Sequence, residues 1–517
     1  MGFLFAAFQA GLAGGVTLIT HGLNGDVDGW VTGMATNIPN YERFPGTNFT
    51  CYEMYFYASG GSYYLTADQV GGSAPADTDS GEIVVKLDWR QLADGNSYNT
   101  YQIAAFVVPA LLSTNFFPGL GGHALAELPL HLIGHSRGGS LICEMSRLLG
   151  TNGVWVDQVT TLDPHPLNDS AFPLDFLLYS AVDAPAVTYA NILFHDNYWQ
   201  DLNSFVYGKS VNGAYVRQLI SLDGGYGGLT GSHSDVHLWY HGTLDWRTPT
   251  SDTEASITSA ERSSWWTAYE SNGVVAGFKY SLIGGGNRLS TDQPLGSGSP
   301  EIRDGYNQWW DFGAGVFDNR TGLPSDNGNW PNLIRFDRTE TNQVTQGKST
   351  PVSFAYQWAR VDTNLATVSI YLDDDFNPFN QNQRLLAQIP VPANGASYVS
   401  FVTTNITFEA TNAAPGDYQL FGAISGGGRT RYLYAPETVQ IISGPQPPRM
   451  EIQKPNDTQF VVSIAGAPGQ TIVLQTSPDL KTWFPLVTNS LTTEQWFYTN
   501  SLSTDGLQNF YRAVREP

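Results

Sequence analysis

The chain has 517 residues, which is more than a single hydrophobic core usually organises, so we expect two or more domains. Its 25 Lys and Arg residues against 47 Asp and Glu residues give a net charge of −22, which disfavours nucleic acids and anionic membranes as partners. Hydrophobic residues make up 41% of the chain and charged residues only 14%, a mixture that favours folded, β-rich extracellular domains over disorder.

The N-terminal segment 1–15 (MGFLFAAFQAGLAGG) is apolar but contains no basic residue. It is shorter than the roughly 20 residues that a helix needs to cross a bilayer, and one interpretation is the remainder of a secretion signal. No apolar run elsewhere is long enough for a membrane span. We therefore predict a secreted protein with no transmembrane segment. The two cysteines, Cys51 and Cys143, are too few for a disulfide framework, and we favour two free thiols over one disulfide.

Short apolar runs alternate with helical patterns through the first half of the chain. Such alternation predicts a mostly parallel sheet covered by helices, which is the α/β fold class. Two aromatic runs around Gly60 and Gly61 predict a hairpin within residues 31–81, an insertion suited to form the wall of a pocket. The expected strands are 15–22, 82–89, 128–136, 156–163 and 189–196, and the expected helices are 99–114 and 138–150.

The pattern changes after about residue 260. Residues 261–342 are rich in glycine and asparagine and show few regular signals, so we expect an irregular extension packed on the first domain, 1–260. Residues 343–443 alternate apolar and polar positions, as the strands of a β-sandwich do. A linker, SGPQPPR, then precedes a small C-terminal β-module, 450–517. The predicted architecture is an α/β domain followed by all-β accessory domains.

A serine framed by glycines lies between the strand predicted at 128–136 and the helix that follows it. Residues 134–138 (GHSRG) fit the Gly-x-Ser-x-Gly pattern of a nucleophile elbow, in which the turn exposes the serine hydroxyl at the end of the sheet. The pentapeptide alone fits a tight turn equally well. The segment LITHGLNG (18–25) adds a second signal, because the amides of Leu23 and Arg137 are then placed to bind a developing oxyanion.

A serine nucleophile needs a histidine base held by a carboxylate. Asp163 follows a predicted strand, and Asp196, at the end of the next one, is the alternative acid. His233, His237 and His241 recur at helical spacing downstream, so His233 or His237 is the candidate base. A zinc pair and a plain packed helix face are the other interpretations of this spacing, although no glutamate follows the first histidine as in zinc proteases.

Four segments within residues 15–243 together resemble the pancreatic-lipase-like group of α/β-hydrolases. LITHGLNGDVDGW resembles its oxyanion loop, IVVKLDWR its valine-aspartate-tryptophan strand, HLIGHSRGG its elbow and VTTLDPHP its acid segment. The resemblance implies the α/β-hydrolase fold. It also implies Ser136 as nucleophile, Asp163 as acid, His233 as base, and the Leu23 and Arg137 amides as the oxyanion hole. The chain departs from the group at Arg137, where leucine is usual, at Ser232, which replaces a cysteine, and in lacking the lid disulfide.

These motifs predict a serine carboxylic ester hydrolase, an esterase or lipase, that works through an acyl-enzyme and requires no organic cofactor. One alternative is a polyester depolymerase of the polyhydroxyalkanoate type, whose β-modules bind an insoluble surface. The other is a carbohydrate- or surface-binding protein that carries an inactive hydrolase domain. Tyr198 and Trp199 either line the substrate pocket or belong to the core.

An acidic segment in the predicted sandwich, YLDDDFNPFNQN, places Asp373, Asp375 and Asn377 at alternate positions. This spacing lets one loop converge oxygens on a cation, so it predicts a structural calcium site, although the glycine and the distant glutamate of an EF-hand are absent. A solvated acidic turn is the alternative. The exposed aromatics expected in 450–517 predict either binding to a glycan or other insoluble surface, or ordinary packing.

Overall fold

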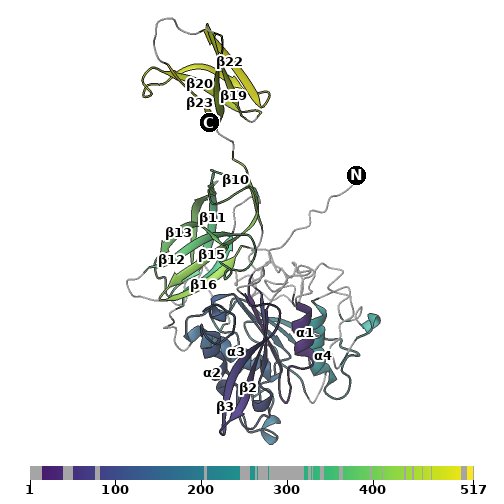
Figure 1. Cartoon of the computed structure of the whole chain (residues 1–517). Coiled ribbons are helices and arrows are strands. Elements are labelled where there is room, and N and C mark those ends of the chain that lie inside the picture. The colour runs from purple at the N-terminus through teal and green to yellow at the C-terminus, as the bar shows by residue number, and fades with distance from the viewer. Residues whose placement is uncertain are drawn as a thin grey trace. The chain divides into compact units, whose positions relative to one another are not determined.

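A computed structural model gives the arrangement of the chain (Figure 1). The predicted extension, 261–342, and the N-terminal segment lie largely outside the described residues. The described residues are 14–38, 50–75, 82–202, 206–244, 255, 257–261, 265, 278, 320–323, 328, 330–337, 343–359, 365–395, 399–409, 411–435, 438–444, 448–456, 458–466, 468–501 and 509–515.

The chain divides into two compact units. The first unit comprises Met1–Gln343, Ser349–Thr407 and Asp417–Gln440, and the second comprises Val344–Lys348, Phe408–Gly416 and Ile441–Pro517. The finer division into 1–260, 261–342, 343–443 and 450–517 stays a prediction. Among the described helices, none is both long and apolar enough to cross a membrane.

The first unit is built on an eight-stranded sheet with the order β3-β2-β4-β1-β5-β6-β7-β8. Every residue of its central strands is buried, as expected for apolar runs covered on both faces. Neighbouring strands pair in parallel except β2 and β3, which are antiparallel, so the sheet is mixed. The strands are β1 (Val16–Thr20), β2 (Thr50–Ser59), β3 (Ser62–Gly71), β4 (Ile83–Asp88), β5 (Leu130–His135), β6 (Gln158–Leu162), β7 (His195–Trp199) and β8 (Tyr215–Gln218).

Strands β2 and β3 form the hairpin that the aromatic runs predict, and that prediction is confirmed. Gly60 and Gly61 adopt φ values of 59° and 79°, the left-handed conformations that a two-residue type I′ turn requires. Tyr57 and Tyr64 lie opposite each other in the register and stack at 5.7 Å between ring centroids. The hairpin therefore extends one edge of the sheet.

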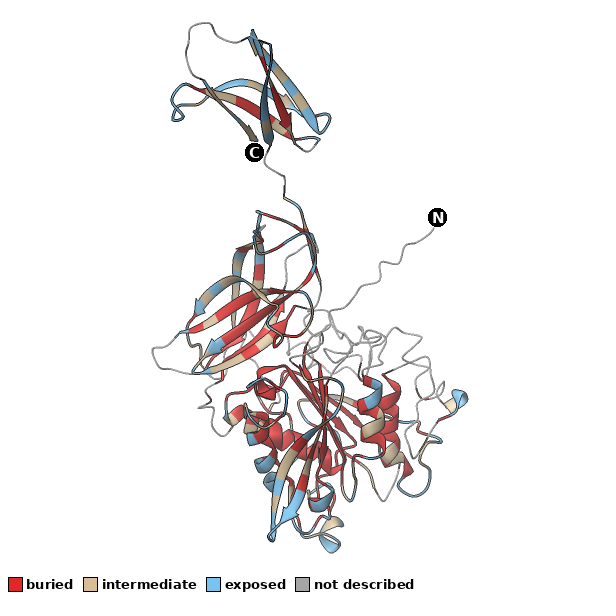
Figure 2. Ribbon diagram, viewed as in Figure 1, coloured by how far each residue is buried: buried red, intermediate tan, exposed pale blue. Residues whose placement is uncertain are grey.

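Four helices flank this sheet in the described residues: α1 (Trp30–Asn37), α2 (Thr100–Leu111), α3 (Arg137–Thr151) and α4 (Gly231–Gly242). Figure 1 shows α2 and α3 on one side of the sheet and α1 and α4 on the other. Helix α2 begins at a capping box, in which the Asn99 side chain accepts from the Gln102 amide and the Gln102 side chain accepts from the Asn99 amide. Figure 2 shows the sheet as a buried layer between the helices.

The predicted fold class, α/β with the α/β-hydrolase fold, is wrong. Strands far outnumber helices in the described chain, most sheets are antiparallel, and the large sheet is mixed, so the protein is β-rich. The predicted alternation of strand and helix stops after α3. Residues 163–194 connect β6 to β7 with only a 3₁₀ turn, η5 (Asp175–Leu177), because prolines at 164, 166, 173 and 185 remove the amide donors that an α-helix needs.

The remaining strands form smaller sheets, in which β9, β11 to β16 and β18 to β23 pair antiparallel. One has the order β10-β17-β15-β12-β13 with β16 paired to β15, and a second has the order β14-β11-β9. Strand β9 lies before residue 343, where the sequence suggested that the sandwich begins. The strands are β9 (Asn332–Asp337), β10 (Gln343–Thr345), β11 (Ser349–Gln357), β12 (Ala366–Asp373), β13 (Arg384–Val391), β14 (Ser400–Thr407), β15 (Gly416–Gly426), β16 (Arg429–Tyr434) and β17 (Val439–Ile442).

The second unit contains two three-stranded sheets, β18-β19-β22 and β21-β20-β23. Its small core is aliphatic with one aromatic, and consists of Phe460, Val462, Ile464, Ile472, Leu474 and Leu491. Exposed and partly buried positions alternate along β22, which matches a sheet with one face in solvent, whereas β19 buries Phe460 and residues 462–464. The strands are β18 (Arg449–Asn456), β19 (Gln459–Ala465), β20 (Thr471–Ser477), β21 (Phe484–Ser490), β22 (Gln495–Ser501) and β23 (Phe510–Arg515).

Candidate active site

Ser136 is the single residue between β5 and α3. Its backbone has φ 58° and ψ −126°, a conformation that is strained for any residue with a side chain. Three hydrogen bonds hold it there: the Ser136 amide donates to the Leu162 carbonyl at 2.9 Å, and the Ser136 carbonyl accepts from the amides of Gly139 and His165. The sharp turn leaves the Ser136 side chain at the wall of a cavity.

The glycines around Ser136 are required by close backbone approach. A Cβ atom on Gly134 would lie 2.2 Å from the Gly138 carbonyl oxygen, and one on Gly138 would lie 2.4 Å from the His21 carbonyl oxygen. A Cβ atom on Gly22 would lie 2.6 Å from Cβ and 3.0 Å from Oγ of Ser136. The loop after β1 therefore packs directly against the serine.

For the ester hydrolysis that the sequence motifs predict, we expect Gly22→Ala to lower kcat/KM by about 100-fold or more, because the added methyl group must displace Ser136 or the loop after β1. Steady-state kinetics on a p-nitrophenyl ester measure the effect. Gly322→Ala is the matched control, since nothing lies within 4 Å of its added Cβ atom. Equal activity of the two variants would contradict the close packing of this loop on the serine.

His233, at the start of α4, pairs with Asp163, which directly follows β6. The His233 Nδ1 donates to the Asp163 Oδ2 at 2.6 Å. Asp163 is fully buried and also accepts from the Gln200 amide, the Gln200 side chain and the Gly208 amide at 2.8–3.0 Å. These donors stabilise the carboxylate, and its hydrogen bond selects the histidine tautomer whose Nε2 is free to accept a proton.

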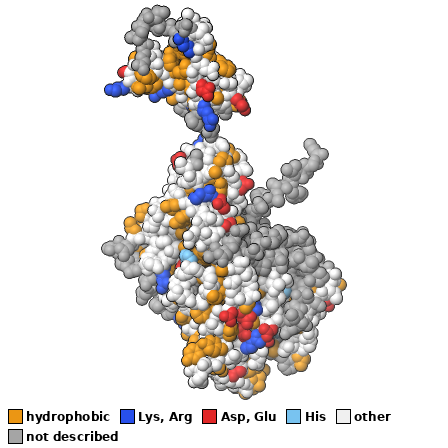
Figure 3. Space-filling view, viewed as in Figure 1, with side chains coloured by type: hydrophobic (Ala, Val, Ile, Leu, Met, Phe, Trp, Pro, Cys, Tyr) orange, Lys and Arg blue, Asp and Glu red, His pale blue; other side chains and the backbone are white. Residues whose placement is uncertain are grey.

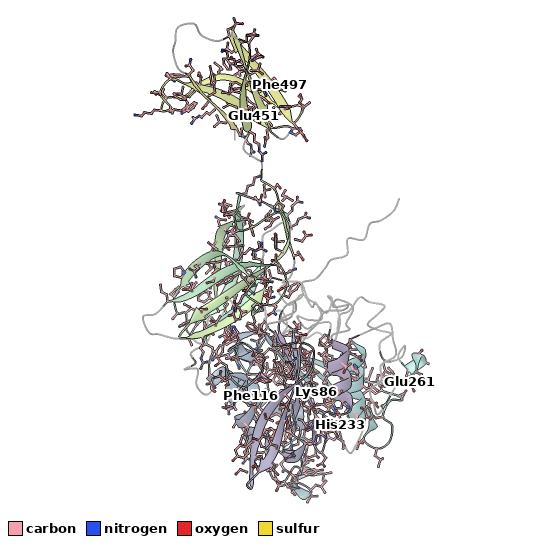
Figure 4. The ribbon with its side chains drawn as sticks, viewed as in Figure 1. Lys86, Phe116, His233, Glu261, Glu451 and Phe497 are labelled. Atoms are coloured by element: carbon pink, nitrogen blue, oxygen red, sulfur yellow. The ribbon has the colours of Figure 1, made fainter. Side chains whose placement is uncertain are left out.

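Ser136 and His233 line the same cavity, whose volume is about 450 Å³. Figure 4 labels His233 on its helix within the first unit. Leu23 and Arg137 also line the cavity, and neither backbone amide donates a hydrogen bond to another protein group of the described part of the chain. Among the described residues, the hydrogen bond of the His233 side chain goes to Asp163 and not to the Ser136 hydroxyl. In hydrolases the bond between serine and histidine often tightens only when substrate is bound.

His135 fixes the backbone beside this pair. Its Nε2 donates to the carbonyl oxygen of His233 at 2.9 Å. Burial, together with the neighbouring His233 ring, holds the pKa of His135 well below its usual range, so the ring is neutral and retains one proton for this bond. His135 is therefore a support for His233.

Asp196, the alternative acid, is not among the residues that line the cavity, whereas His237, the alternative base, lines it one helical turn after His233. The Asp196 carboxylate accepts from the Thr160 hydroxyl at 2.6 Å and from the Gln158 side chain at 3.2 Å. Burial raises the pKa of Asp196 to about 6. His237 stacks on Trp30 with ring centroids 4.4 Å apart, and burial lowers its pKa well below the usual range. Within the described chain, neither side chain is hydrogen-bonded to the His233–Asp163 pair, and the choice of acid and base stays a prediction.

The other predicted pocket and metal positions lie as follows. Tyr198 packs against Trp239 and Tyr240 in the core, and neither Tyr198 nor Trp199 lines the cavity around Ser136. His241 contacts Asn37 through its Nε2 at 2.7 Å. Within the described ranges, no three His, Cys, Asp or Glu side chains are grouped as metal ligands.

The predicted calcium segment forms a chain of turns after β12. Asp373 accepts from the Tyr434 hydroxyl at 2.5 Å, and Asp375 accepts from the Asn377 amide at 2.8 Å. The Asn377 side chain donates to the Pro75 carbonyl and accepts from an amide two residues on. A cation here would have to displace protein donors, and calcium binding at Asp373, Asp375 and Asn377 stays a prediction.

Asp373 gives the fold a pH dependence. Burial raises the pKa of Asp373 from 3.8 to about 7, so between these values the folded protein binds more protons than the unfolded chain. Stability therefore falls as pH rises from about 4 to about 7. We expect Asp373→Asn, which keeps an acceptor for Tyr434, to be more stable than the parent by about 2 kcal/mol at pH 8 and equal to it at pH 4.

Urea unfolding at the two pH values measures this difference. A stability difference independent of pH would show that the Asp373 carboxyl titrates normally. The same measurement with added Ca²⁺ tests the calcium prediction, because a bound cation stabilises the charged carboxylate and would raise the stability of the parent but not of Asp373→Asn.

The residues that hold Asp163 and the side chain of Arg137 were not predicted from the sequence. Gln200 and Gly208 bind Asp163, and Asp183 binds the side chain of Arg137, yet none of them belongs to a recognisable motif. Gln200 directly follows β7. Its position after a strand is the one signal by which the sequence could have indicated it. The irregular segment around Asp183 offered no such signal.

No family model and no curated protein matches this chain. Similar solved structures include the alkylpurine DNA glycosylase AlkC of Pseudomonas fluorescens, with 9% identity, a TM-score of 0.16 and coverage of 22% of this chain and 31% of that one. A superoxide reductase of Ignicoccus hospitalis has 11% identity and a TM-score of 0.14 over 22% of this chain and 80% of that one. The ICAM-5 D1-D4 ectodomain has 19% identity and a TM-score of 0.17 over 38% and 49%. Because all these TM-scores are far below 0.5, the comparisons support no family and no function for this chain.

Proposed function

We propose that the chain is a serine hydrolase of carboxylic esters, an esterase or lipase. The observation that carries the proposal is the meeting of a strained serine, a histidine bonded to a buried carboxylate, and two unoccupied amides at one cavity. The motif resemblance to pancreatic-lipase-like hydrolases supports the same chemistry and is part of the proposal. So is secretion, which the composition favours.

Each group of the site has a distinct task in ester cleavage. The Ser136 Oγ attacks the ester carbonyl carbon while the His233 Nε2 accepts the hydroxyl proton, and Asp163 stabilises the imidazolium that forms. The amides of Leu23 and Arg137 bind the oxyanion of the tetrahedral intermediate. The alcohol then leaves with the proton from His233, and a water molecule deprotonated by the same histidine releases the acid from Ser136.

Covalent labelling tests this proposal. We expect a fluorophosphonate to modify the folded protein once, at Ser136, and the protein to hydrolyse p-nitrophenyl butyrate until it is labelled. Peptide mass spectrometry locates the adduct. Absence of both labelling and hydrolysis, combined with affinity for an insoluble glycan, would favour the surface-binding alternative with an inactive hydrolase domain.

An apolar rim beside the cavity favours esters presented at an uncharged surface. Leu174, Phe176, Leu177 and Leu178 in and around η5 are 66–70% exposed, and Leu178 lines the cavity. The intervening Asp175 turns inward and pairs with His165, Oδ2 to Nε2, at 3.2 Å. A cluster of large exposed apolar side chains is costly in water and is typical of contact with an apolar surface. Figure 3 shows hydrophobic side chains gathered over parts of the first unit.

We expect the double variant Phe176→Ser, Leu177→Ser to hydrolyse a tributyrin emulsion about tenfold more slowly, because less apolar area is buried on adsorption. Hydrolysis of dissolved p-nitrophenyl acetate should change less than about twofold. Phe401→Ser removes an equally apolar, 52% exposed side chain that does not line the cavity, and it is the control. An equal loss on both substrates would show that the rim supports the site and does not bind the surface.

A polyester depolymerase is the second candidate, because the second unit also exposes aromatics. Phe484 and Phe497 are 53% and 59% exposed, and Phe497 lies on β22 (Figure 4). Release of soluble oligomers from a polyhydroxyalkanoate film, measured against the rate on tributyrin, separates this activity from that of a lipase. If substitution of Phe497 lowers the rate of oligomer release from the film but leaves the rate of tributyrin hydrolysis unchanged, the result would favour a polyester depolymerase.

A further inference from the structure

The side chain of Arg137 is fully buried behind the candidate oxyanion hole. Its Nε donates to the Asp183 Oδ2 at 2.7 Å, and one Nη donates to the Asp183 Oδ1 at 2.8 Å and to the Tyr98 carbonyl at 2.7 Å. The two side chains are each 0% exposed. The residue that carries one of the two candidate oxyanion amides therefore also carries a buried, fork-shaped ion pair.

Asp183 connects three elements through this pair. Besides Arg137 at the start of α3, its carboxylate accepts from the amide of Thr100, the first residue of α2, and from the amide of Leu167, each at 3.0 Å. Leu167 and Asp183 both belong to the irregular crossover between β6 and β7. The carboxylate thus holds the first turns of α2 and α3 and the crossover in one fixed arrangement.

On its other side the guanidinium reaches the oxyanion loop through Trp89. The Arg137 guanidinium carbon lies 5.1 Å from the Trp89 ring centroid. Trp89 stacks on His21 with centroids 5.1 Å apart and planes 12° apart, and its amide donates to the His21 Nε2 at 3.1 Å. The His21 Nδ1 in turn donates to the Gly22 carbonyl at 2.9 Å. The carbonyl of Gly22 belongs to the same peptide group as the Leu23 amide.

We infer that the Arg137 guanidinium, held between Asp183 and Trp89, is a positioning group that fixes the separation of the Leu23 and Arg137 amides. The contacts run without interruption from the residue that carries one amide to the peptide that carries the other. A cation over an aromatic face and an ion pair in a dry interior are both stiff contacts, because moving either partner exposes an uncompensated charge.

This inference rests on the proposed function and deepens it. An oxyanion hole works only if both donors lie about 3 Å from the position that the oxyanion will occupy, so an error in their separation weakens the transition state more than the bound substrate. Loss of the guanidinium should consequently appear in kcat and leave KM nearly unchanged.

The test compares the parent with Arg137→Leu, Arg137→Lys and Asp183→Asn. For p-nitrophenyl butyrate we expect Arg137→Leu to lower kcat by about 10- to 100-fold with KM within about twofold. A trifluoromethyl ketone, which forms a tetrahedral oxyanion with Ser136, should lose affinity by the same factor. Arg137→Lys keeps the charge but not the fork, and Asp183→Asn keeps the shape but not the charge, so both should show smaller losses of the same kind.

Arg147→Leu is the matched control, because it removes another arginine of α3 whose ion pair, with Glu144, lies outside the cavity lining. We expect its kcat to equal that of the parent. The inference is overturned if folded Arg137→Lys and Asp183→Asn, checked by circular dichroism, keep the parent kcat and inhibitor affinity while only their melting temperatures fall. It is also overturned if KM changes as much as kcat. A parent that neither hydrolyses esters nor reacts with fluorophosphonate would instead show that the proposed function has failed.

Discussion

Replacing Ser136 by alanine is expected to lower kcat for ester hydrolysis by about 10⁴- to 10⁶-fold, because no other hydroxyl of the cavity lies in the elbow. The fold should persist, since the backbone bonds of Ser136 to Leu162, Gly139 and His165 do not involve its side chain. Initial rates on p-nitrophenyl butyrate and unfolding curves measure the two properties separately.

Ser234→Ala is the control for this variant. Ser234 lines the same cavity and neighbours His233 on α4, but it does not belong to the turn between β5 and α3. Its removal should change kcat less than about threefold. A folded Ser136→Ala variant that retains the activity of the parent would refute the assignment of Ser136 as the nucleophile.

Asp163→Asn is expected to lower kcat by about 10⁴-fold, because an amide at this position permits the wrong tautomer of His233 and no longer stabilises its cation. His233→Ala should cost at least as much. Asp196→Asn and His237→Ala are the comparison variants, because Asp196 and His237 are also buried. Asp196 lies on β7, and His237 lines the cavity one turn after His233 on α4.

Asp196→Asn should leave kcat within about threefold, because its bonds to Thr160 and Gln158 can be made by an amide. Its neutral side chain should also raise stability above pH 6, since burial disfavours the charged carboxylate, whose pKa is about 6. Activity that disappears in Asp196→Asn and survives in Asp163→Asn would exchange the two roles. If activity is lost in His237→Ala but not in His233→Ala, His237 and not His233 would be the base.

The strands that position Ser136 could be located from the sequence, whereas the fold class could not. Uniformly apolar runs such as 83–88 and 130–135 are buried on both faces and produce a plain signal. The fold class is wrong because antiparallel strands dominate the described chain and the hairpin β2–β3 makes the large sheet mixed. The irregular connection 163–194 was not foreseen either. In that segment prolines and side-chain bonds to Asp175 and Asp183 replace regular structure, and such long-range bonds leave no periodic pattern.

Some residues of the candidate site have a local sequence signal, and others do not. Ser136, Asp163 and His233 each stand at the end of a strand or the start of a helix, so local patterns found them. Only the resemblance favoured Asp163 over Asp196, because the sequence predicted both at the end of a strand, whereas Asp196 lies inside β7. The contacts of Arg137 could not be foreseen, since its partners Asp183 and Trp89 are far from it in the chain and meet it only in the folded core.

The strained backbone of Ser136 sets a limit on engineering this protein for heat resistance. A glycine at residue 136 would relieve a conformation that costs about 1–3 kcal/mol, in part offset by the greater freedom of glycine in the unfolded chain. Selection for thermal tolerance alone would therefore tend to reward loss of the hydroxyl that the proposed ester hydrolysis needs. Directed evolution of this chain has to screen turnover and heat resistance together, because at this residue the two properties oppose each other.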